Sequence, residues 1–98
     1  MRGDLRRALA LVRRRTHRGA TMPVRLLEKA ECGLCAETYR VLRRVALDDP
    51  LEIERVDITT DPDLFERYAL RIPVLMAGER ELDAAGLDDR AVRAWLRA

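Results

Sequence analysis

Two cysteines stand close together in the run Glu31-Cys32-Gly33-Leu34-Cys35, and the chain has no others. Two thiols at this spacing form and break a disulfide, or they supply two ligands to a metal. A cysteine attacks a disulfide only as its thiolate, so a nucleophile of this kind needs a pKa lowered from about 8.5. The pair therefore predicts thiol–disulfide exchange or metal binding.

The two cysteines are expected to have different roles in exchange. Cys32 directly precedes a predicted helix, where unpaired amides and the positive end of the helix dipole favour a thiolate. Cys35 lies one turn further along and is placed to attack a mixed disulfide formed on Cys32. Gly33 is expected to let the backbone bend around the sulfur, and Lys29 adds a positive charge that Glu31 opposes.

The segments on either side of the dithiol predict a βαβ unit. Val24–Leu27 is a short apolar run, typical of a buried strand, and it ends just before the cysteines. Apolar residues then recur at helical spacing from Cys35 until Asp48-Asp49-Pro50, where proline forbids continuation. Leu51–Ile58 follows as a second strand, whose expected buried members are Ile53, Val56 and Ile58. A strand, a helix and a strand in this order predict a parallel pair.

The second half predicts a short helix, a hairpin and a final helix. Asp61 is a suitable cap with Pro62 in the first helical position, and Asp88 caps the last helix. Between them, Ile72–Ala77 reads as a strand that opens with proline, and Arg80–Leu82 reads as its hairpin partner. The predicted order is βαβαββα, an α/β fold. Four aromatic residues at helical spacing are expected in its core: Tyr39, Phe65, Tyr68 and Trp95.

Charge divides the chain into two parts. Its 98 residues allow one small domain, and 48% hydrophobic with 37% charged residues is typical of a soluble globular protein. Residues 1–21 carry seven arginines against the single acidic residue Asp4, whereas the later residues are acidic on balance. We therefore expect a basic N-terminal extension over residues 1–21, either helical from Asp4 to Arg15 or disordered, and a folded domain over residues 22–98.

The extension is not expected to bind nucleic acid or a membrane. No aromatic residue stands among its arginines to stack on bases. Its longest apolar run, Ala8–Val12, is too short for a membrane span or the core of a secretory signal. Without such a signal we expect a cytoplasmic protein, where a lasting structural disulfide is rare.

Residues 22–98 resemble the thioredoxin superfamily, and more closely its minimal glutaredoxin-like members. The resemblance rests on Cys32-Gly33-Leu34-Cys35 between a strand and a helix, on the segment Tyr68–Leu75, which is similar to the cis-proline strand of the family, and on the closing hairpin and helix. It implies a mixed four-stranded sheet flanked by helices. It also implies that Ile72 and Pro73 present the substrate, with Pro73 in the cis form.

The resemblance further implies a set of substrate contacts. Lys29 matches the lysine that glutaredoxins place near the carboxylate of glutathione, and Gly33 and Leu34 lie between the cysteines. Gly86 and Asp88 match part of the Gly-Gly-(Ser/Cys)-Asp signature, in which Ala85 and Leu87 replace the other two residues. The implied function is a monomeric thiol–disulfide oxidoreductase that needs no cofactor and uses glutathione as a co-substrate. Its partners would be protein disulfides or glutathione mixed disulfides, with glutathione or a disulfide reductase as the reductant.

Three alternatives remain beside this interpretation. In the first alternative, the two cysteines are only small buried residues of the core. In the second, the domain is a redox-inert interaction module. In the third, the thiolates bind a metal. One chain offers only His17 as a further strong ligand, so no metal site forms within it, but two chains together supply four thiolates for zinc or an iron–sulfur cluster.

Overall fold

The computed structural model describes residues 21–98, and in this range the predicted order of elements is confirmed. Apart from Thr21, the predicted basic extension lies outside the described residues. No helix within residues 21–98 is long and apolar enough to cross a bilayer. The elements are β1 (Met22–Glu28), α2 (Gly33–Val45), β2 (Leu51–Asp57), the 3-10 turn η1 (Ile58–Thr60), α3 (Pro62–Tyr68), β3 (Val74–Ala77), β4 (Arg80–Asp83) and α4 (Asp89–Arg97).

The strands form the expected mixed four-stranded sheet, in the order β2-β1-β3-β4. β1 pairs in parallel with β2 over its whole length, from Met22 opposite Leu51 to Glu28 opposite Asp57. On its other side β1 pairs antiparallel with β3, which forms the hairpin with β4. The strand that leads into the cysteine loop is therefore hydrogen-bonded on both sides.

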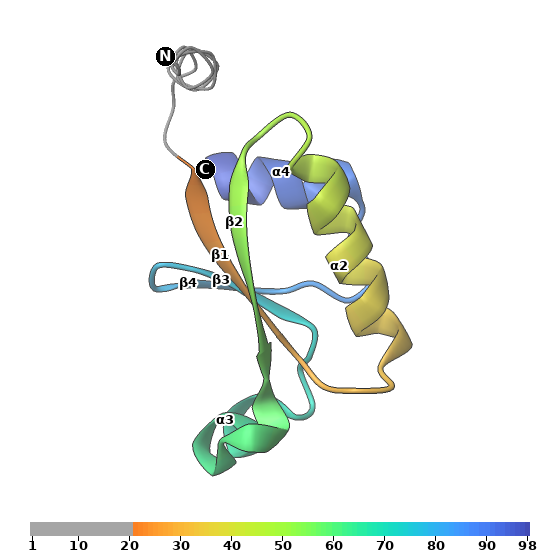
Figure 1. Cartoon of the computed structure of the whole chain (residues 1–98), viewed down its shortest axis with the longest axis vertical. Helices are drawn as coiled ribbons and strands as arrows, with labels where there is room; N and C mark the ends of the chain where they lie inside the picture. The colour runs from red at the N-terminus through yellow and green to blue at the C-terminus, as the bar shows by residue number, and fades with distance from the viewer. Residues whose placement is uncertain (1–20) are drawn as a thin grey trace, which may run out of the picture.

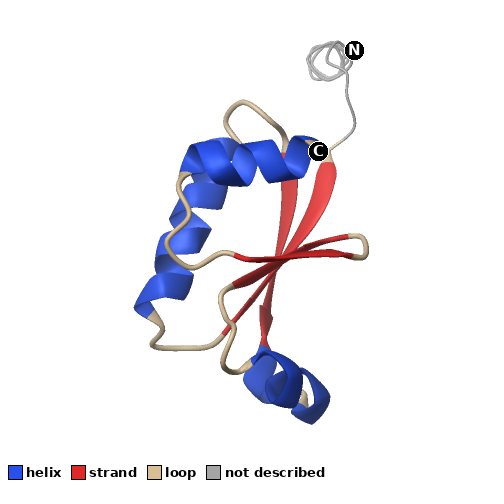
Figure 2. Cartoon of the chain, turned by 180° about the vertical axis from the view of Figure 1, so that it is seen from behind, coloured by secondary structure: helices blue, strands red, loops and turns tan. Residues whose placement is uncertain are grey.

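Helices cover both faces of the sheet. Val24 and Leu26 of β1 point into a core shared with α2 and α4, whereas Leu27 points to the opposite face and packs with Tyr68 of α3. Alternation of side chains along a strand accounts for this division. Figures 1 and 2 show α2 and α4 next to each other, with α3 at the far end of the molecule from α4. The cysteine loop lies at the α3 end.

The predicted helix caps are confirmed. The carboxylate of Asp61 accepts from the amides of Asp63 and Leu64, and that of Asp88 accepts from the amide of Ala91. Each oxygen satisfies first-turn amides that have no partner inside the helix.

Three details of the sequence prediction are wrong. β3 begins at Val74 rather than Ile72, because the amide of Ile72 donates to the carbonyl of Tyr68 at 3.1 Å and Pro73 has no amide to give. Phe65 is 45% exposed, since the short helix α3 buries only Tyr68. Ile53 and Val56 are half-buried, because β2 is an edge strand, whereas Ile58 is buried in η1.

Ion pairs at the α2–α4 corner predict a stability that falls in acid. The Arg97 guanidinium holds the pKa of Asp49 below its ordinary value of 3.8, and Arg44 does the same for Asp89. A depressed folded-state pKa stabilises the protein above the unfolded pKa, and this contribution disappears as the pH falls through the folded pKa. We expect the melting temperature, measured by circular dichroism, to drop as the pH is lowered from ~5 to ~2.5. Asp49→Asn should show a smaller drop, and an equal drop would contradict this assignment.

Candidate active site

The two cysteines are joined by a disulfide at the start of α2. Their Cα atoms lie 5.2 Å apart, within the usual range for this bond. Cys32 is half-buried at the N-cap position, while Cys35, one turn into the helix, is only 1% exposed. Only one of the two sulfurs is therefore open to a reagent in solution.

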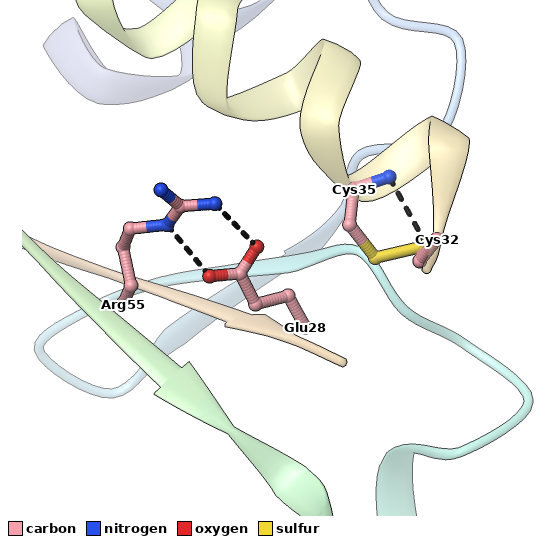
Figure 3. Close-up of a disulfide and its surroundings, with 4 residues drawn as sticks. All are labelled: Glu28, Cys32, Cys35 and Arg55. Atoms are coloured by element: carbon pink, nitrogen blue, oxygen red, sulfur yellow. Dashed lines mark hydrogen bonds and ion pairs between the residues drawn. A yellow bond between two sulfur atoms is a disulfide. The ribbon is translucent and has the colours of Figure 1, made fainter. Parts of the chain in front are cut away.

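The helix start is arranged to stabilise negative charge on Cys32. The Cys32 sulfur accepts the backbone amide of Cys35 at 3.1 Å, as the dashed line in Figure 3 indicates. The first turn of α2 contains no acidic residue, and its last turn carries Arg43 and Arg44. The positive end of the helix dipole thus faces the sulfur without a competing carboxylate from that turn.

Backbone freedom is needed at Glu31 rather than at Gly33, contrary to the sequence prediction. Glu31 has a φ of 57°, in the left-handed region that side chains disfavour, and this turn brings the chain from β1 to the helix start. Gly33 is already helical, and a Cβ placed there would meet no atom within 4 Å. A larger residue would therefore fit at position 33.

A pocket of about 330 Å³ opens beside Cys32. It brings two of the predicted contact residues, Lys29 and Gly33, together with the sulfur. Leu34 points outward and is 54% exposed. The lining residues are Glu28, Lys29, Ala30, Glu31, Cys32, Gly33, Ala36 and Arg55.

Sequence reasoning missed a charged pair in this pocket, Glu28 with Arg55. The guanidinium of Arg55 donates to both carboxylate oxygens of Glu28, at 2.7 and 3.1 Å, and lies 3.8 Å from the ring centroid of Tyr39. The hydrogen bonds to Glu28 raise the pKa of Arg55 above its ordinary value. Figure 3 shows the pair beside the disulfide, on the ends of β1 and β2. The only sequence signal was a charged residue at an inward-facing position of each strand.

Comparison with known proteins decides the family. Residues 23–97 match the family described as "Glutaredoxin-like domain (DUF836)". The chain belongs to this glutaredoxin-like family. An X-ray structure of a Northeast Structural Genomics target protein from X. campestris is similar, with a TM-score of 0.67 and 32% identity over 76% of this chain and 95% of the other. No curated protein matches the chain. The glutaredoxin-like, thioredoxin-type fold inferred from the sequence is thus confirmed.

The remaining predicted contacts of this glutaredoxin-like domain lie outside the Cys32 pocket. The Ile72–Pro73 bond is cis, Pro73 is buried, and its carbonyl accepts the amide of Ala84 at 2.9 Å. Gly86 has a φ of 79° in the loop between β4 and α4, a conformation that favours glycine. Asp88 follows in the same loop, where one carboxylate oxygen caps α4.

The described part of this glutaredoxin-like chain offers no ready metal site. Within residues 21–98, no group of three or more His, Cys, Asp and Glu side chains is arranged to hold a metal ion.

Proposed function

We propose that this glutaredoxin-like protein is a thiol–disulfide oxidoreductase in which Cys32 attacks and Cys35 resolves. The observation that carries the proposal is the difference between the two sulfurs. Cys32 is half-buried and accepts an amide at the helix start, whereas Cys35 lies behind it at 1% exposure. A substrate can reach the first sulfur, and only the first sulfur can reach the second.

Exchange proceeds in two displacements. The Cys32 thiolate attacks one sulfur of a substrate disulfide, so a bond from Cys32 to that sulfur forms, the substrate S–S bond breaks, and the departing thiolate takes up a proton. Cys35 then loses its proton and attacks the Cys32 sulfur. The Cys32–Cys35 disulfide forms and the second substrate thiol leaves. Two electrons have passed from the dithiol to the substrate.

Substrate and reductant are proposed from the resemblance and the pocket. Lys29 beside Cys32 supports contact with a carboxylate such as that of glutathione, and the Ile72–Pro73 segment supports an extended peptide partner. The substrates that the dithiol reduces are then protein disulfides or glutathione mixed disulfides. The protein acts as a monomer and needs no bound cofactor. Glutathione or a disulfide reductase resets the dithiol, as suits a protein of the reducing cytoplasm.

Differential alkylation of the purified protein tests this function. After reduction, one cysteine should react with iodoacetamide at a rate that rises with pH, with a midpoint below the pKa of about 8.5 of free cysteine. Peptide mapping should identify this cysteine as Cys32. After mild oxidation, mass spectrometry should find an intramolecular disulfide and no free thiol. Equal, slow alkylation of both cysteines would refute the proposal. Bound metal together with a dimer in the unreduced protein would favour the two-chain metal site instead.

A further inference from the structure

The loop between α3 and β3 is held to β4 by a hydrogen bond from the residue directly before it. Tyr68, the last residue of α3, is buried, and its hydroxyl donates to Oε2 of Glu81 at 2.6 Å. This bond lowers the pKa of Glu81 and raises that of Tyr68, so the carboxylate and the neutral phenol are the stable pair. One end of the loop is thereby fixed to the hairpin strand.

A second attachment comes from Arg71, directly before Ile72 and Pro73. Its guanidinium donates to Oε1 of Glu81 at 3.0 Å and to Oδ1 of Asp83 at 2.8 and 3.1 Å. Glu81 and Asp83 are alternate residues of β4 and therefore share one face of the sheet. The guanidinium also lies 5.0 Å from the ring centroid of Tyr68. Charge-assisted bonds to two carboxylates fix the direction of a side chain more firmly than a single contact.

These attachments act on the loop and are separate from the dithiol pocket. Tyr68, Arg71, Glu81 and Asp83 are all absent from the residues that line the pocket beside Cys32. Leu70, between the two attached residues, is fully exposed and adds no packing to hold the loop. The Ile72–Pro73 segment has packing of its own, because Ile72 packs against the core cluster that contains Tyr68 and Pro73 is buried. The polar contacts of Tyr68 and Arg71 add a further attachment on the α3 side of the segment.

We propose that Arg71 and Glu81 are positioning residues that hold the Ile72–Pro73 segment in place for an extended polypeptide disulfide. This inference rests on the proposed function, because it assumes that this segment presents the substrate. A polypeptide pairs with the segment through its main chain, so a displaced segment weakens its binding. A small disulfide without a peptide chain needs only the Cys32 sulfur. The two residues therefore set the preference for polypeptide over small substrates.

Kinetics with two probes test this proposal. The first probe is a ten-residue peptide with an internal disulfide, and the second is 2-hydroxyethyl disulfide. For Glu81→Gln we expect KM for the peptide to rise about 3- to 10-fold with kcat within twofold of wild type. The rate with 2-hydroxyethyl disulfide should not change. Arg71→Lys, which keeps the charge but cannot span both carboxylates in the same way, should lie between wild type and Glu81→Gln.

Matched variants separate positioning from stability and from charge. Glu79→Gln makes the same charge change in the exposed turn of the same hairpin and should behave as wild type. Tyr68→Phe keeps the buried ring and removes only the hydroxyl, so it should also raise KM for the peptide while the protein stays folded. Unchanged KM in both Glu81→Gln and Tyr68→Phe would overturn the proposal. If the wild type turned over neither probe, the proposed function itself would fail.

Discussion

Replacing Cys32 by serine is expected to reduce turnover of a peptide disulfide to the uncatalysed rate. The variant loses the half-buried sulfur that accepts a hydrogen bond from the Cys35 amide, and the remaining cysteine, Cys35, is only 1% exposed. A hydroxyl is far less ionised than a thiol at neutral pH, so serine cannot perform the first displacement. To measure this result, the fully reduced variant is mixed with the peptide disulfide, and the thiols released from the peptide are counted with a chromogenic disulfide.

Cys35→Ser is the matched comparison, because it removes one sulfur and keeps the nucleophile. It should complete the first displacement and stop, leaving one peptide linked to Cys32 in each molecule, visible by mass spectrometry. Without added thiol it should not turn over. Turnover by Cys32→Ser, or a peptide linked to Cys35 in that variant, would show that the roles are reversed.

Replacing Arg55 by alanine is expected to lower the free energy of unfolding and to slow the reaction of Cys32. The side chain of Glu28 is only 13% exposed, and both of its carboxylate oxygens accept hydrogen bonds from the Arg55 guanidinium. Removing one partner leaves a partly buried charge beside the dithiol, which costs about 1–2 kcal/mol at this degree of exposure. The unpaired negative charge also disfavours a thiolate in the same pocket, so alkylation of Cys32 should require a higher pH. Urea unfolding and alkylation rates measure the two effects.

A second cross-strand pair of β1 and β2 provides the control. Arg25 donates one hydrogen bond to Glu54, at 3.2 Å, and their side chains are 57% and 63% exposed. Arg25→Ala should therefore change stability by no more than about 0.5 kcal/mol and leave the Cys32 rate unchanged. In the double variant Glu28→Gln/Arg55→Ala, removal of the charge should restore the Cys32 rate. Equal effects of Arg25→Ala and Arg55→Ala would contradict a special role for the pair.

The order of elements was predictable because each boundary has a local cause. Asp61 and Asp88 cap helices by accepting hydrogen bonds from nearby amides, and α2 ends at Val45, a few residues before Pro50, so short stretches of sequence suffice. The start of β3 was not predictable. It depends on the amide of Ile72 bonding back to Tyr68, which only the folded loop decides.

The candidate site likewise has features that the sequence predicts and features that it does not. The spacing of Cys32 and Cys35 and their place before a helix can be read directly, so the dithiol was found. Arg55 and Glu28 meet only through the register of two strands separated by a helix, and Glu81 meets Tyr68 only through the pairing of β3 and β4. The left-handed backbone at Glu31 had no signal, since glutamate is not a residue that favours it.

The central place of β1 determines which part of this small protein opens last. Its amides bond to β2 on one side and β3 on the other, and Val24, Leu26 and Leu27 are almost fully buried. Strands of this kind exchange their amide hydrogens only when the whole domain unfolds, whereas edge strands and loops open at lower cost. The chain passes from this strand to Cys32 in four residues, so the sulfurs are attached to the most persistent part of the molecule. Edge strand β2 can open locally without carrying the dithiol with it.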